Sequence, residues 1–180
     1  MPATHLALLR GINVGGKHAL PMRDLRELFV EAGCRDVRTY IQSGNVLFTA
    51  DPDAVAPLPR LIAARITERF GYRVPVVLRT AAELDEVVRG NPFLGEGAAE
   101  GTLHVLFLAD LPEARRVAAL DPDRSPPDAF VVRGREVYLR LPNGAARTRL
   151  TTDYFDATLA TTSTGRNWRT VSTLAALMGG

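Results

Sequence analysis

The order in which strand and helix patterns alternate near the start is the feature that most limits what this chain can fold into. Four segments have the short apolar or β-branched runs of strands, and two have apolar residues at the spacing of a helix face. The strands are expected at 5–10, 36–41, 45–49 and 73–78, and the helices at 22–32 and 54–70. This βαββαβ order predicts a ferredoxin-like (split βαβ) unit, in which two helices cover a four-stranded antiparallel sheet.

The second half of the chain repeats this pattern less regularly. Strands are expected at 103–108, 129–133 and 137–141, helices at 81–88, 112–120 and 149–159, a loop at 91–101, and a closing amphipathic helix at 168–178. The fold class expected is therefore α+β, with two ferredoxin-like units, antiparallel sheets and a C-terminal amphipathic helix. The predicted domains are residues 1–80 and 102–180, joined by a helix and linker at 81–101.

Composition predicts a globular protein that needs no cofactor to fold. The 180 residues are 46% hydrophobic, and the net charge is only +2, without the long basic run of a nucleic-acid tail. Cys34 is the sole cysteine, so no disulfide can form, and we expect it to be a packing residue. The chain shows no signal peptide or transmembrane run, which favours the cytoplasm and argues against a membrane partner.

A glycine-rich loop follows the first predicted strand and runs from Gly11 to Lys17, with the sequence Gly-Ile-Asn-Val-Gly-Gly-Lys. Glycines allow positive φ and can turn backbone N–H groups to one side, where Lys17 adds a cation that suits an anion. The alternative is a sharp turn with no ligand. The spacing also fits part of a nucleotide-binding P-loop, but His18 stands where Ser or Thr must bind the metal, and Pro21 delays the helix.

The predicted topology brings this loop to a second polar segment. In a split βαβ unit the first two strands are parallel, so the loop after the first strand and the hairpin after the second leave the same sheet edge. Gly71-Tyr72 should leave there as well. We interpret this rim, residues 10–17 and 42–45, as a site for a phosphate-bearing small molecule. Its candidate ligand-binding residues are Arg10, Asn13, Gly15, Gly16, Lys17, Gln42, Ser43, Gly44 and Asn45.

A second hypothesis places RNA or single-stranded nucleic acid on the sheet. Alternation along the second strand puts Arg38, Tyr40 and Gln42 on one face, and RNA-recognition modules stack bases on aromatic residues of an open sheet. The third strand supplies only one aromatic residue, Phe48, so the match is incomplete. The alternative is that Tyr40 packs against the second half of the molecule.

Near the C-terminus, Arg166 and Asn167 are the remaining binding candidates. Asn167 is a candidate N-cap for the last helix, and Arg166 offers a guanidinium fork to a carboxylate or phosphate, or an ion pair within the protein. The three histidines have no metal-ligand spacing, which argues against a metal site. A third hypothesis is an enzyme that uses the rim on a phosphorylated substrate, but no acid–base pair identifies a catalytic residue or a cofactor.

Several motifs of this chain together resemble the bacterial family called domain of unknown function 1697. They are the segments 9–17 and 37–45, Met22 with Leu25, Asn91-Pro92-Phe93, and Arg166-Asn167-Trp168 with Thr170-Val171. The resemblance implies a cytosolic α+β protein of two ferredoxin-like units and carries no agreed activity. This chain departs from the family pattern at Gly165 and Arg169, so no role is transferred to a hydroxyl or amide at those positions.

Overall fold

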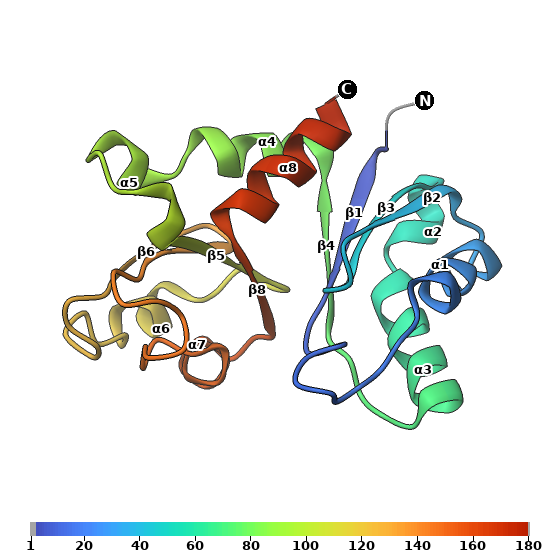
Figure 1. The fold of residues 1–180 in the computed structure, drawn as a ribbon, viewed down its shortest axis with the longest axis horizontal. Coiled ribbons are helices and arrows are strands. Elements are labelled where there is room, and N and C mark those ends of the chain that lie inside the picture. The colour runs from blue at the N-terminus through green and yellow to red at the C-terminus, as the bar shows by residue number, and fades with distance from the viewer. Residues whose placement is uncertain (1–2, 180) are drawn as a thin grey trace. The chain divides into compact units, whose positions relative to one another are not determined.

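A computed structural model describes residues 3–179 of the chain (Figure 1). The chain forms two compact units. Unit 1 contains the described residues up to Leu84 together with those from Leu174 onward, and unit 2 contains Asp85–Thr173. No helix among the described residues is both long and apolar enough to cross a membrane.

Unit 1 has the element order that the sequence predicts. Its elements are β1 (His5–Leu9), α1 (Met22–Glu31), β2 (Arg35–Tyr40), β3 (Asn45–Thr49), α2 (Pro52–Val55), α3 (Leu58–Phe70) and β4 (Val76–Thr80). The strands form an antiparallel sheet in the order β2-β3-β1-β4. Because β3 lies between β1 and β2, those two strands are parallel to each other, and both end at the same edge of the sheet.

Two elements of unit 1 differ from the expected ones by more than one residue, and a proline lies at each difference. The helix expected at 54–70 divides into α2 and α3 near Pro57, because proline has no backbone N–H to donate the helical hydrogen bond. The strand expected at 73–78 begins only after Pro75, whose carbonyl accepts a hydrogen bond from Arg10 N at 3.1 Å.

The core of unit 1 lies between the sheet and its helices. Leu25 and Phe29 of α1 pack with Ile62 and Ile66 of α3, and all four are fully buried. Cys34 belongs to this core, and burial raises the pKa of its thiol. The prediction that Cys34 is a packing residue is confirmed.

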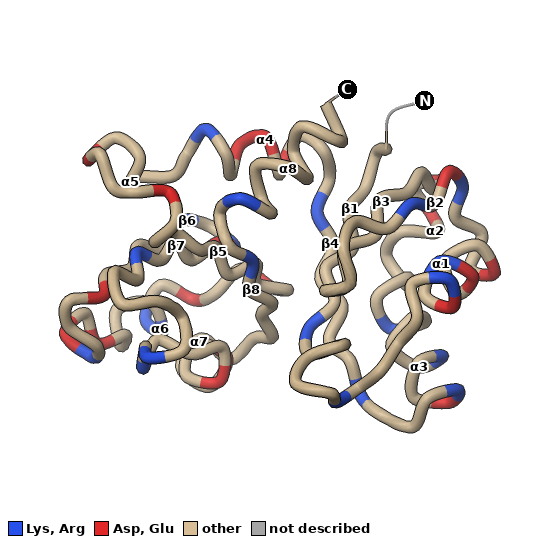
Figure 2. The backbone as a smooth tube through the Cα atoms, viewed as in Figure 1, with Lys and Arg blue, Asp and Glu red and all other residues tan. Residues whose placement is uncertain are grey.

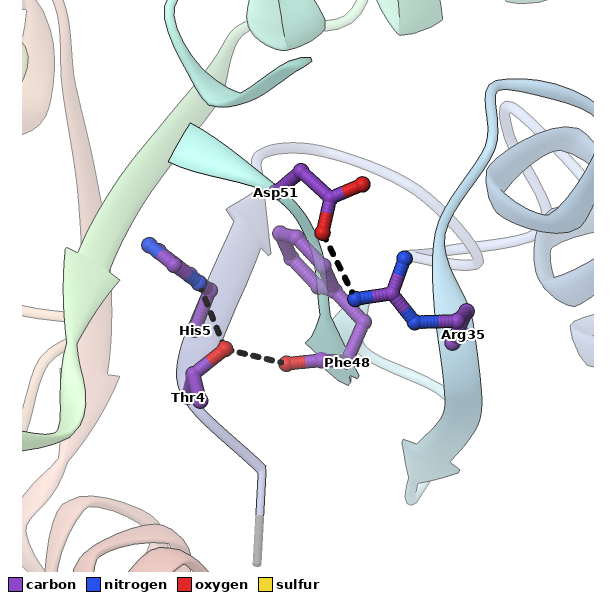
Figure 3. Close-up of polar contacts among 5 residues, drawn as sticks. All are labelled: Thr4, His5, Arg35, Phe48 and Asp51. Atoms are coloured by element: carbon purple, nitrogen blue, oxygen red, sulfur yellow. Dashed lines mark hydrogen bonds and ion pairs between the residues drawn. The ribbon is translucent and has the colours of Figure 1, made fainter. Parts of the chain in front are cut away.

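Polar contacts join the strands at the end of the sheet opposite the rim (Figure 3). Thr4 Oγ1 lies 2.8 Å from His5 Nδ1 and donates a hydrogen bond of 3.5 Å to the carbonyl of Phe48. Beside them, Arg35 Nη2 forms an ion pair of 2.9 Å with Asp51 Oδ1. The carboxylate that follows the hairpin is therefore paired at this edge and lies away from the rim.

Unit 2 has a sheet of the same strand order as unit 1. After α4 (Ala81–Arg89), which crosses the unit boundary, its elements are α5 (Pro92–Gly95), η1 (Glu100–Thr102), β5 (Leu103–Leu108), α6 (Ala114–Ala118), β6 (Ala129–Arg133), β7 (Glu136–Arg140), α7 (Thr152–Leu159) and β8 (Ser163–Asn167). The chain then enters α8 (Trp168–Gly179). The sheet is antiparallel in the order β6-β7-β5-β8.

The expected fold class is confirmed: the protein is α+β, with two four-stranded antiparallel sheets and a C-terminal helix. One strand, β8, was not predicted from the sequence. The segment 91–101, predicted to be a loop, contains the short helices α5 and η1.

Candidate functional site

The two segments of the rim lie side by side, as the predicted topology requires. Leu9 N donates a hydrogen bond of 2.9 Å to the carbonyl of Gly44, and Asn13 Nδ2 donates one of 2.9 Å to the carbonyl of Gln42. The loop after α3 reaches the same place, since Arg10 N is bonded to the carbonyl of Pro75. Three segments that are distant in sequence therefore meet at this edge of unit 1.

The tip of the rim is a tight turn built on two glycines. Val14 and Lys17 form an isolated antiparallel bridge, and Lys17 N donates to the carbonyl of Val14 at 3.0 Å. Gly15 and Gly16 have φ values of +57° and +73°, the positive pair that a type I′ turn requires. A Cβ built on either glycine meets nothing within 4 Å, so the space above the turn is open.

The base of the loop is held by the side chain of Asn13. Its Oδ1 accepts from Leu20 N at 2.8 Å, and its Nδ2 donates to the carbonyls of Leu20 and Gln42 at 2.9 Å each. Asn13 itself has φ +52°, a conformation that asparagine tolerates better than most residues. Ile12 and Leu20 are buried on either side, so the loop is anchored at both ends while its tip faces solvent.

His18 and Tyr72 reinforce the same loop, and the sequence analysis did not include them in the site. Their rings stack at a centroid distance of 4.5 Å, and His18 Nδ1 lies 2.9 Å from the carbonyl of Gly11. The Tyr72 hydroxyl shares its one proton between the carbonyls of Ala19 at 2.8 Å and His18 at 3.1 Å, and burial raises the pKa of Tyr72. The sequence did indicate the position of Tyr72, because Gly71 ends α3 and the predicted topology brings the following loop to the rim.

The two cations of the rim differ in exposure, and Figure 2 shows basic residues where β1 ends and in the loop that follows it. Lys17 is exposed, and within residues 3–179 its ammonium group forms no ion pair. Arg10 is half-buried, Ser43 is half-buried and Gln42 is exposed. Gln42 does not continue the face of β2, because that strand ends at Tyr40 and the chain turns at Ile41, which has φ +47°.

Gly44 and Asn45 form the floor of the rim. A Cβ on Gly44, which has φ +87°, would lie 2.8 Å from Leu9 Cβ. The side chain of Asn45 is fully buried, and its Nδ2 donates to the carbonyl of Tyr40 and to Ser43 Oγ, each at 3.0 Å. Gly44 therefore allows the turn to approach β1 closely, and Asn45 holds the two sides of the turn together.

The sheet face expected to be open is exposed only in part. Arg38 is exposed and Tyr40 is half-buried on β2. Register places Arg38 opposite Leu47, and Leu47 opposite Leu6, and both leucines are buried. The centre of this face therefore offers no exposed platform for stacked bases.

The remaining candidates, Arg166 and Asn167, lie on β8 in unit 2. Arg166 is 8% exposed, and its Nη1 donates to Thr164 Oγ1 at 2.9 Å and to the carbonyl of Gly165 at 2.7 Å. Burial lowers the pKa of its guanidinium to about 10. Asn167 Oδ1 accepts from Thr170 N at 2.9 Å in the first turn of α8, which confirms its predicted capping role.

The described residues contain no cluster of three or more His, Cys, Asp or Glu side chains that could hold a metal ion. The rim itself is cationic and glycine-bearing, and its hydrogen-bonding side chains are amides and hydroxyls.

Comparison with known proteins agrees with the fold. A search of curated proteins found no match. A solved structure of a conserved bacterial protein from Streptococcus pneumoniae has 20% sequence identity and a TM-score of 0.72, over 99% of each chain. The family model described as protein of unknown function (DUF1697) matches residues 3–138, a range that contains the whole rim. The chain therefore belongs to the DUF1697 family.

Proposed function

We propose that this protein binds a phosphate-bearing small molecule at the rim of unit 1. The observation that carries the proposal is the environment of Lys17. This exposed ammonium has no ion-pair partner in the described part of the chain, and it adjoins two glycines whose positive φ leaves open space above the turn. A cation beside glycine amides is a recurring arrangement for binding anions.

The rigidity of the loop supports binding rather than a simple turn. A short turn between two elements needs no side-chain support, whereas here the Asn13 amide donates two hydrogen bonds, and the Tyr72 hydroxyl shares its one proton between the carbonyls of His18 and Ala19. A loop that is ordered before the ligand arrives loses less conformational entropy on binding. The rim therefore has the preorganisation that a small anionic ligand requires.

Each rim residue has a distinct role in this proposal. Lys17 and Arg10 supply positive charge, and charge-assisted hydrogen bonds to phosphate oxygens are stronger than neutral ones. Gln42 and Ser43 supply hydrogen bonds to the rest of the ligand. Asn13, Gly44 and Asn45 hold the shape of the site, because their side chains or backbone are committed to it.

The chain offers a direct test because Lys17 is its sole lysine. Reductive methylation with ¹³C-formaldehyde retains the charge and gives one lysine side-chain NMR signal besides that of the terminal amine. Titration with pyrophosphate should move the Lys17 signal saturably and leave the terminal signal in place. A Lys17 signal that stays fixed at millimolar pyrophosphate would refute the proposal.

A variant pair makes the test quantitative. Lys17→Ala should weaken pyrophosphate binding in calorimetric titration by about tenfold, the effect of losing one charge-assisted contact. Arg60→Ala is the matched control, because Arg60 is exposed on α3 and lies near the opposite end of that helix from the rim. Equal affinities for the two variants would contradict the assigned role of Lys17.

A thermal-shift screen separates ligand classes. Nucleotides, sugar phosphates and a short RNA are compared, since a ligand that binds only the folded state raises the midpoint. Binding of RNA that falls steeply with added salt, without any response to small phosphates, would favour the nucleic-acid hypothesis instead.

A further inference from the structure

We infer that a cavity in unit 2 binds a small uncharged molecule with an apolar body and one hydroxyl group. The cavity has a volume of about 330 Å³ and lies between the sheet and the segment 145–152 that leads into α7. All its lining residues belong to unit 2. The volume is at the lower end of the range for ligand pockets, which suits a molecule of one or two rings.

The body of the cavity is apolar. Leu106 and Leu139 of the sheet line it together with Leu141 and Leu150, which flank the segment after β7. Gly165 of β8 completes the wall, and a Cβ there would lie 2.9 Å from Leu106 Cδ2. The glycine therefore gives Leu106 the room that a side chain would take. These walls provide hydrophobic burial for a ligand's carbon skeleton.

One polar group in the wall remains unsatisfied. His104 Nδ1 is buried and has no hydrogen-bond partner in the described structure. Two neighbouring hydroxyls do have partners: Thr148 Oγ1 accepts from Leu150 N at 3.0 Å, and Thr151 Oγ1 accepts from Tyr154 N at 3.2 Å. A buried polar atom without a partner costs free energy, which a ligand hydroxyl would recover. A hydroxyl both donates and accepts, so it suits either tautomer of the ring.

The electrostatics of the cavity favour an uncharged ligand. Burial lowers the pKa of His104, with the Thr102 backbone acting in the opposite direction, so the imidazole is neutral at neutral pH. Arg166 is the one charged residue among the described residues that line the cavity. Register pairs it with Val105, between the pairs His104–Asn167 and Leu106–Gly165, so strand alternation directs its side chain to the opposite face. No acidic residue is among the lining residues. A charged ligand would lose its hydration here without gaining a counter-charge.

Three probes with a similar body test this inference: para-ethylphenol, ethylbenzene and the para-ethylbenzoate anion. Backbone amide chemical shifts are followed during titration of the full chain. We expect saturable shifts at the cavity residues, with para-ethylphenol binding about fivefold more tightly than ethylbenzene, as one recovered hydrogen bond gives. The anion should bind most weakly. His104→Phe should remove the preference for the phenol over ethylbenzene.

A pair of surface variants keeps the test decisive if His104→Phe fails to fold. Ala145 lines the cavity and is exposed, so Ala145→Trp should obstruct its mouth without disturbing the core. Ala146→Trp adds the same bulk at the next residue, which is exposed and does not line the cavity. Binding that is lost in the first variant and kept in the second supports the site. Equal binding in both, tightest binding of the anion, or no shifts at millimolar phenol would overturn it.

Discussion

Replacing Asn13 with Ala gives the sharpest test of how the rim is held. The substitution removes three hydrogen bonds, two with Leu20 that are half-buried and one with Gln42 that is exposed. The two sheltered bonds contribute about 1 kcal/mol each and the exposed one about 0.5 kcal/mol. Alanine at φ +52° adds about 1 kcal/mol of backbone strain. The expected loss in the free energy of unfolding is therefore about 3.5 kcal/mol.

Chemical denaturation followed by circular dichroism measures this loss. Asn13→Gly separates the two contributions, because glycine adopts positive φ freely and should recover about 1 kcal/mol of the deficit. Asn143→Ala is the control, an exposed asparagine in unit 2. If Asn13→Ala changes the free energy of unfolding by less than about 0.5 kcal/mol, the usual effect of a surface substitution, then the Asn13 hydrogen bonds do not hold the loop.

Two further predictions concern a turn and a titration. Gly44→Ala should destabilise the protein by about 2–5 kcal/mol in the same assay, because the strain of positive φ and the contact with Leu9 Cβ act together. Gly15→Ala should cost only about 1–2 kcal/mol, because a Cβ there meets no neighbour. Equal costs for the two variants would argue against the steric contact. Burial lowers the pKa of folded His104 below its ordinary value of 6.5, so the unfolded chain binds more protons and the free energy of unfolding falls as pH drops below that value. His104→Phe should reduce this loss between about pH 7 and pH 5, measured by chemical denaturation at each pH. His5 should leave a residual slope because burial lowers its pKa too, and a slope unchanged from wild type would contradict a buried neutral His104.

The elements of unit 1 could be predicted because each carries its own local pattern. In α1, the buried Leu25, Leu28 and Phe29 recur at helical spacing between a proline and a glycine. Strand β8 carries no such pattern. Its sequence, Ser-Thr-Gly-Arg-Asn, contains no aliphatic or aromatic residue, yet Ser163 and Thr164 are fully buried. Pairing with β5 makes this segment a strand, and that contact is invisible to local periodicity.

The position of the rim could be predicted, but its internal structure could not. That residues 10–17 and 42–45 are neighbours follows from topology alone, because parallel strands end at one edge of a sheet. The clasp by Asn13 and the stacking of His18 on Tyr72 depend on positive φ at two non-glycine residues and on contacts that span long separations in sequence. The sequence from Gly11 to Lys17 indicates a turn and a positive charge, whereas the contacts that fix the turn come from residues elsewhere in the fold.

The buried Asn45 also determines how the β2–β3 hairpin is aligned. Val46, Leu47 and Phe48 are all buried, so the side chains on both faces of β3 are apolar and a slip by one residue would exchange one apolar set for another. Asn45 breaks this degeneracy, because register pairs it with Tyr40, whose carbonyl accepts a hydrogen bond from the Asn45 amide. We expect a slip that separates the two residues to leave this buried amide without that partner, which favours the pairing that forms the rim.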